Sequence, residues 1–178
     1  MTAELHFDAS ELQQLSRAIA NLPGQIKAKA MASAMRRMRD MARTRIVKRS
    51  AERTDLPVRK VAALTTAHFN AGGNTIEVVE KSGWFRLYDL GATQNAKGVR
   101  VRGRGSYRSA FIAQMASGHR GVMKRVGKER LPIRELFGPN PAHDVTNNPE
   151  EFLKVLAELI EDHLAPRVLH ELDRLLPR

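Results

Sequence analysis

The chain contains no cysteine and few aromatic residues. Without cysteine it has no disulfide, no thiolate nucleophile and no cysteine-ligated zinc site. This composition is compatible with a reducing cytosol. Aromatic residues make up only 5% of the chain, so its seven methionines take over part of their role as core-filling side chains. Apolar residues still reach 42% of the 178 residues, which is enough for one domain with a buried core.

Targeting signals and long apolar runs are also lacking. Residues 1–18 have neither a basic flank nor an apolar centre, so we expect no signal peptide. No stretch reaches the length of uncharged apolar sequence that a transmembrane helix requires. We therefore expect the protein to be made and folded in the cytoplasm and to have no membrane partner.

Groups that could support catalysis or metal binding are not arranged together. The six histidines show no close metal-ligand spacing. Neighbouring acids such as Glu150 and Glu151 do not face each other on a helix. We therefore expect no catalytic residue, no metal, no cofactor and no small-molecule substrate. A hydrolase that uses His119 ranks far below the other interpretations, because a hydrogen bond that stabilises a turn explains this histidine better.

Positive charge is what the chain has in excess. The formal net charge is +11 and the pI is about 10.7, so the protein will be attracted to polyanions, although a solvated basic surface is the default interpretation. The densest basic segment is residues 95–109, which we expect to be a mobile hairpin or a long loop. Its five cations are candidates for assembly or polyanion contact: Lys97, Arg100, Arg102, Arg104 and Arg108.

The N-terminal third is predicted to be helical. A short strand over residues 4–8 and a helix from Asp8 or Ser10 precede the Leu22-Pro23-Gly24 break. Residues 25–50 carry a broad apolar face made by Ile26, Met31, Ala30, Ala34, Met35, Met38, Met41 and Ala42. This spacing predicts a long helix with methionines in the core. Its basic side faces solvent, nucleic acid or an acidic partner.

The middle of the chain is predicted to be rich in strands. Residues 64–72 and 74–81 are enriched in β-branched residues around a Gly-Gly-Asn turn, which is typical of a hairpin. Residues 84–90 form either a strand or an apolar turn that leads into Gly91. We expect residues 110–115 to pair with 122–126 across the Ser-Gly-His-Arg-Gly turn.

The C-terminal region is predicted to be a helix that begins at Asn148-Pro149-Glu150-Glu151, where cap, proline and acids suit a helix start. Pro166 either kinks this helix or separates it from a second one. Beyond Pro166 the apolar residues change sides, and we expect them to meet a neighbouring subunit or, by a kink, the same core. These residues are Leu169, Leu172, Leu175 and Leu176.

Together these elements predict one α+β domain over residues 1–178. An antiparallel β-sheet is packed by a long N-terminal helix and by a C-terminal helix kinked near Pro166, with a projecting basic loop. The parts are a helical segment over 1–57, a sheet-rich segment over 58–140 and the C-terminal helix or helices over 148–178.

Residues 84–140 carry an ordered series of short blocks. They are Trp84-Phe85-Arg86-Leu87-Tyr88-Asp89-Leu90-Gly91-Ala92-Thr93-Gln94, Lys97-Gly98-Val99, Phe111-Ile112-Ala113-Gln114-Met115, Ser117-Gly118-His119-Arg120-Gly121-Val122, Arg125, Gly127, Pro132-Ile133, Leu136 and Gly138-Pro139. In order and spacing the series resembles the phage and prophage minor tail proteins of the lambda Z type. Two positions depart from that pattern: Met123 stands where an aromatic is expected and Asn140 where serine is more usual.

The resemblance implies a structural, non-enzymatic tail protein with an α+β fold. It implies a position at the head-proximal end of a siphophage tail, a role in tail completion or head–tail joining, and a ring of copies that contacts other tail or neck proteins. The protein would assemble in the host cytoplasm and end in the virion tail. The alternative is an accessory or packaging protein that binds DNA non-specifically through its basic surface.

Overall fold

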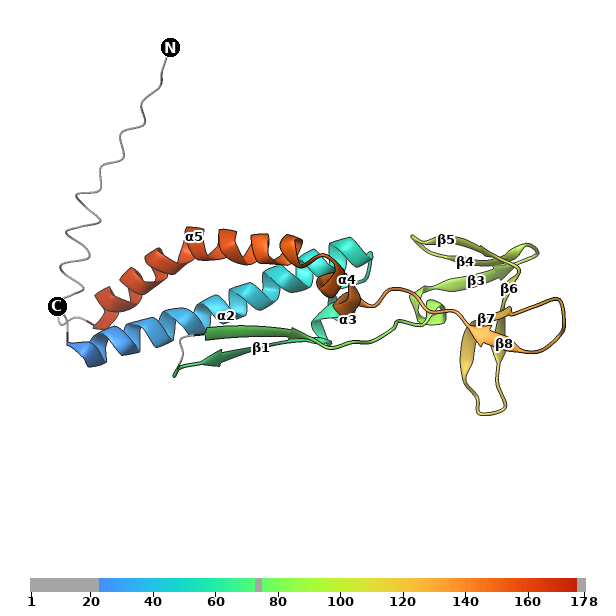
Figure 1. Ribbon diagram of the computed structural model, residues 1–178, viewed down its shortest axis with the longest axis horizontal. Coiled ribbons are helices and arrows are strands. Elements are labelled where there is room, and N and C mark those ends of the chain that lie inside the picture. The colour runs from blue at the N-terminus through green and yellow to red at the C-terminus, as the bar shows by residue number, and fades with distance from the viewer. Residues whose placement is uncertain (1–22, 73–74, 176–178) are drawn as a thin grey trace, which may run out of the picture. The chain divides into compact units, whose positions relative to one another are not determined.

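The computed structural model describes residues 23–72 and 75–175. The helices are α2 (Gly24–Thr54), α3 (Val58–Ala62), α4 (Pro141–Asn147), α5 (Pro149–Leu175) and the 3-10 helix η1 (Leu87–Leu90). The strands are β1 (Thr65–Asn70), β2 (Thr75–Glu80), β3 (Ala92–Asn95), β4 (Gly98–Val101), β5 (Gly105–Arg108), β6 (Ala110–Gln114), β7 (Arg120–Arg125) and β8 (Ile133–Glu135). The predicted α+β class is confirmed (Figure 1). The strand and helix expected over residues 4–19 lie outside the described residues.

Helix α2 is the long helix that the apolar spacing predicted. The Pro23 carbonyl accepts the N–H of Ile26 (3.0 Å), which begins the helix. Its buried side is lined by small residues such as Ala30 and Ala34 together with Met38, which allows neighbouring elements to approach closely. The helix ends at Thr54 because Asp55 adopts a φ of 50°.

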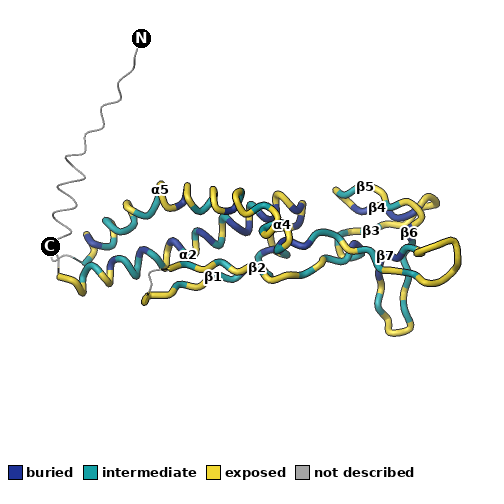
Figure 2. Tube along the Cα trace, viewed as in Figure 1, coloured by how far each residue is buried: buried dark blue, intermediate teal, exposed yellow. Residues whose placement is uncertain are grey.

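The described residues divide into two compact units. The first contains α2 as far as Ala42, residues 67–72 and 75–77 of the β1–β2 hairpin, and α5 from Leu156. Met38 from α2 and Leu159 from α5 are among its buried side chains, and Figure 2 shows the buried positions recurring along one side of α2. The hairpin agrees with the two strands predicted on either side of the Gly-Gly-Asn turn.

Helix α5 begins at Pro149, as the Asn-Pro-Glu-Glu pattern predicted, and it continues through Pro166 to Leu175. The alternative of a separate second helix after Pro166 is therefore wrong. Proline at this position removes one backbone donor, yet the remaining turns keep their helical conformation.

The second unit contains residues 43–66 and 78–155, and its core lies among two three-stranded antiparallel sheets. One has the order β3-β4-β5 and the other β6-β7-β8. Strand β6 pairs with β7 in the register Ile112 opposite Val122, which confirms the predicted hairpin. The core cluster consists of Leu87, Val99, Val101, Ala110 and Val122. Residues 87–90 form η1, so the predicted apolar turn before Gly91 is correct and the strand alternative is wrong.

The basic segment 95–109 contains two strands rather than a long loop. Val99 and Val101 on β4 are buried, whereas Arg100 between them is exposed, so the predicted strand periodicity is present. Gly103 and Gly105 have φ values of 74° and 86° and form the turn into β5. These glycines therefore reverse the chain between β4 and β5, so the hairpin that was predicted for this segment is confirmed and the alternative of a long loop is wrong.

Two short helices were not predicted. Helix α3 follows Pro57 and buries Val61 in a second cluster with Val47, Ala51 and Leu56. Helix α4 begins at Pro141, directly after the break that the sequence indicated. Each is stabilised by contacts from distant parts of the chain, which local sequence patterns do not report.

A polar cluster lies between α2, β2 and the start of α5 within the second unit. Arg53 Nε donates to Asp144 Oδ2 (2.7 Å), and Arg49 pairs with Glu151. The bond from Arg49 lowers the pKa of Glu151. Ser50 Oγ donates to Glu80 Oε1 (2.9 Å), but Glu80 Oε2 is buried without a hydrogen-bond partner. Burial accordingly raises the pKa of Glu80 above 4.5.

Replacing Glu80 with glutamine is therefore expected to stabilise the protein at neutral pH, by up to about 1 kcal/mol, because a neutral amide is less costly to bury than a carboxylate. The raised pKa means that protonation favours the folded state, so Glu80 is least costly below pH 4.5 and becomes destabilising as pH rises through its folded pKa. Urea unfolding of both proteins across this range should show the difference growing with pH. A constant difference would contradict this assignment.

Candidate functional site

The blocks of the motif series from Phe111 to Pro139 lie on the β6–β7–β8 sheet and on the segment after it. Phe111 lies on β6, Gly121 on β7 and Ile133 on β8. Gly118 lies in the turn between β6 and β7 with a φ of 82°, and its N–H donates to the Met115 carbonyl (2.9 Å). This part of the series therefore lies on one sheet and its turns, whereas the blocks before Phe111 lie on η1, β3 and β4.

His119 is held between an arginine and a carboxylate. Its Nε2 lies 2.8 Å from Glu135 Oε2, and its Nδ1 lies 3.2 Å from Arg86 Nη1. An arginine only donates, so Nδ1 accepts from Arg86 and a neutral ring donates from Nε2 to Glu135. Arg86 is fixed in turn by Asp89 (2.7 Å). His119 thus has a structural hydrogen-bonding position in this unit.

Glu135 is the partner of His119 that the sequence did not reveal. It lies on β8, and no spacing rule links it to a histidine in the β6–β7 turn. Gly121 makes the contact possible, because a Cβ at that position would lie 2.5 Å from Glu135 Oε1. The glycine on β7 therefore leaves room for the carboxylate that meets His119.

The Gly138-Pro139 pair packs the chain against the segment before η1. The Gly138 N–H donates to the Phe85 carbonyl (2.6 Å), and the Phe85 N–H donates to the Pro139 carbonyl (3.3 Å). A Cβ on Gly138 would lie 2.9 Å from Leu90 Cδ1. On the other side of β8, the carbonyl of Pro132 accepts the N–H of Val126 (3.1 Å). These motif residues therefore hold strands and turns together.

The two departures from the family pattern both have structural explanations. Met123 is buried on β7 directly opposite Phe111, so a flexible apolar side chain fills the place of an aromatic. Asn140 is buried: its Oδ1 accepts the Gly83 N–H (3.2 Å) and its Nδ2 donates to Ser82 Oγ (2.8 Å). The amide can make both contacts at once because it carries a donor and an acceptor on separate atoms.

The five basic candidates do not share one role. Arg104 Nη2 donates to the carbonyls of Thr54 and Asp55, the second at 2.6 Å, and so satisfies free carbonyls at the end of α2. Arg104 therefore serves the fold. Lys97 and Arg108 line an open pocket of about 420 Å³ above β4 and β5, and Arg100 is exposed on the same sheet. Arg102 is exposed beyond the end of β4.

The C-terminal leucines are distributed along the last turns of α5. Leu172 is buried within the chain, whereas Leu169 and Leu175 are half-buried. Leu176 lies outside the described residues. Leu172 is therefore already part of the packing of the first unit.

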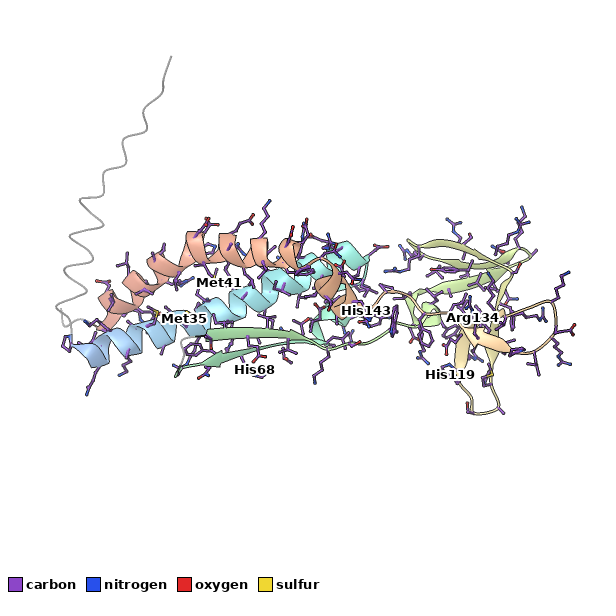
Figure 3. All side chains as sticks on the ribbon, in the orientation of Figure 1. Met35, Met41, His68, His119, Arg134 and His143 are labelled. Carbon is purple, nitrogen blue, oxygen red and sulfur yellow. The ribbon has the colours of Figure 1, made fainter. Side chains whose placement is uncertain are left out.

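Side chains that could bind a metal ion are not gathered in the described residues. Within the second unit, His119 lies in the β6–β7 turn and His143 on α4, and Figure 3 shows these two apart from each other. Within residues 23–72 and 75–175, no group of three metal-binding side chains is found. A search of the same residues also finds no helix long and apolar enough to span a membrane. The second unit instead contains the β6–β7–β8 sheet, which carries motif residues, and the β3–β4–β5 sheet, which carries exposed basic residues.

The sequence matches the prophage minor tail protein Z (GPZ) family over residues 12–178. The chain belongs to this family. The resemblance seen over residues 84–140 is thereby confirmed and extends over most of the chain. No curated protein and no solved structure matches it. As a minor tail protein Z, the protein is a structural component of the phage tail and assembles with other tail proteins.

In this minor tail protein Z, replacing His119 with alanine is expected to cost about 1 kcal/mol of folding stability, because it leaves Glu135 without its donor. The variant should still support tail assembly at permissive temperature, since the role of His119 is structural. Thermal unfolding and complementation of a deleted prophage measure the two effects. Loss of infectivity with unchanged stability would instead point to a direct functional role.

Proposed function

We propose that this protein acts at the head-proximal end of the tail, where it completes tails so that they can join to heads, and that it does so as a ring of copies. The family match over residues 12–178 is the observation that carries the proposal. The structure supports it because motif residues and exposed residues differ in what they contact. Motif residues such as His119 and Gly121 are used within the fold, while the basic β3–β4–β5 sheet and the outer sides of α2 and α5 stay exposed.

Deleting the gene from an inducible prophage is expected to give filled heads beside separate, full-length tails in electron micrographs of the lysate. The reason is that tails would polymerise normally but lack the component that makes them competent for joining. Supplying the gene in trans should restore joined virions. Joined virions without the gene would reject a role in this step, and short or absent tails would place the protein earlier in assembly.

A second candidate function is non-specific DNA contact through the β3–β4–β5 sheet. Lys97, Arg100 and Arg108 are exposed there, and guanidinium groups suit phosphate oxygens. The interaction would be electrostatic, so the logarithm of the affinity should fall linearly with the logarithm of the salt concentration. Three or four phosphate contacts predict a slope of about −2.7 to −3.6.

The matched test removes three charges from this sheet and compares the variant with one that loses three charges elsewhere. The sheet variant is Lys97→Ala/Arg100→Ala/Arg108→Ala, and the control is Lys128→Ala/Arg130→Ala/Arg134→Ala on exposed positions around β8. DNA contact through the sheet predicts that only the first variant loses affinity and shows a flatter salt dependence. Equal losses would indicate generic attraction by net charge.

A further inference from the structure

The outer side of α5 carries an apolar stripe that the chain leaves uncovered. Leu153 is 62% exposed and Ile160 52% exposed, although both are large aliphatic residues. Ala157, also exposed, lies between them, and Leu164, which is half-buried, follows one turn later. Spacings of four, three and four place these residues on one helix face, separate from the buried Leu159. Such a stripe is typical of a helix that packs against a partner.

Acidic residues border one side of this stripe. Helix α5 contains seven Asp or Glu and three Lys or Arg. Glu161 is exposed next to the stripe, and Glu158 is exposed beside Glu161, three residues earlier on the same helix; neither forms an ion pair within the part of the chain that the structure describes. We call the apolar stripe together with Glu158 and Glu161 the acidic α5 face. A partner for this face must combine apolar contact with positive charge.

This chain presents such a surface on α2. Helix α2 contains ten Lys or Arg and only two Asp or Glu. Lys29, Arg36 and Arg37 are exposed on it and form no ion pair within residues 23–72 and 75–175. We call these three residues the basic α2 face. Long arginine stems can cover an apolar stripe while their charged ends reach flanking carboxylates. The same pairing already occurs once inside the chain, where Arg49 of α2 meets Glu151 of α5.

We propose that the acidic α5 face of one copy packs on the basic α2 face of the next. The inference rests on the proposed ring and names its interface. Two different surfaces in contact make a heterologous interface, which closes into a ring when the rotation between copies allows it. Pairing of two α5 faces about a twofold axis is disfavoured, because it would bring Glu158 and Glu161 of both copies together. The interface thus uses Leu153 and Ile160, which precede Pro166 on the same helix.

The test uses two full-length variants with complementary charge reversals. One is Glu158→Lys/Glu161→Lys and the other is Arg36→Glu/Arg37→Glu. Each variant alone places like charges across the interface, so its self-association in sedimentation velocity should weaken roughly tenfold or more relative to the wild type. An equimolar mixture restores opposite charges at every interface and should associate again. Loss in both variants without recovery in the mixture would overturn the proposal.

Ile160→Asp tests the apolar part of the same interface, with Val126→Asp as the control. Val126 is 61% exposed in the β7–β8 connection, so both variants add one charge at an exposed aliphatic position. Circular dichroism should show both folded, and only Ile160→Asp should lose self-association. A wild-type chain that stays monomeric, or an Ile160→Asp chain that associates normally, would overturn the proposal. Complementation of the deleted prophage tests tail completion separately, so the two failures can be distinguished.

Discussion

Replacing Gly98 with alanine is expected to destabilise the second unit by about 3 kcal/mol. Gly98 begins β4 with a φ of 146°, which a residue with a side chain rarely adopts. A Cβ there would also overlap the Tyr107 carbonyl oxygen, and its other near neighbours, Ser109 N and Arg108 Cα, are backbone atoms too. Backbone cannot move aside as a flexible side chain can, so the β4–β5 pairing itself would have to shift.

Gly127→Ala is the matched control for this substitution. Gly127 lies in the β7–β8 connection, and a Cβ there would meet no atom within 4 Å. The control should therefore unfold within about 0.5 kcal/mol of the wild type. Urea unfolding followed by the fluorescence of Trp84, the single tryptophan, reports on the unit that contains both glycines. Equal stability of the two variants would mean that β4 does not approach β5 as described.

Truncating Leu87 to alanine is expected to cost about 3 kcal/mol. Leu87 is fully buried in η1 and belongs to the cluster of Val99, Val101 and Val122, so its removal leaves a cavity between the two sheets. The control is Leu131→Ala, because Leu131 is 67% exposed and its removal opens no cavity. The same fluorescence measurement compares them. A small effect of Leu87→Ala would show that the sheets do not share this core.

The sequence predicted best those elements whose limits are set by local chemistry. Pro23 and Pro57 bracket α2, and the Asn148-Pro149 start of α5 follows from capping and proline geometry. The two predicted hairpins, β1–β2 and β6–β7, were identified from glycine-containing turns between apolar strands. In each case a few neighbouring residues determine the backbone conformation, so no knowledge of the rest of the fold was needed.

The features that the sequence did not reveal depend on residues far apart in the chain. Arg104 looked like one more free cation of the basic segment, yet it contacts the end of α2, some fifty residues earlier. The bond between His119 and Glu135 depends on a side-chain-free position at Gly121. Similarly, α4 begins where buried Asn140 is fixed by Ser82 and Gly83. Spacing rules describe one helix or strand at a time and therefore miss such contacts.

The assembly surface also required the structure. The sequence placed the subunit interface after Pro166, where the apolar residues change sides, and that position stays a prediction. Burial shows that Leu172 is already covered within the chain, while Leu153 and Ile160 remain exposed on the same helix. Apolar periodicity alone cannot separate residues that face the core from those that face a partner, since both recur at helical spacing.

Labelling the protein in the assembled virion tests its proposed place most directly. A gold-binding tag on this chain, introduced into a prophage that the tagged gene complements, can be located by electron microscopy of purified virions. A role in tail completion predicts label at the head-proximal end of the tail in most particles. Label at the distal tip, or spread along the tail tube, would contradict it.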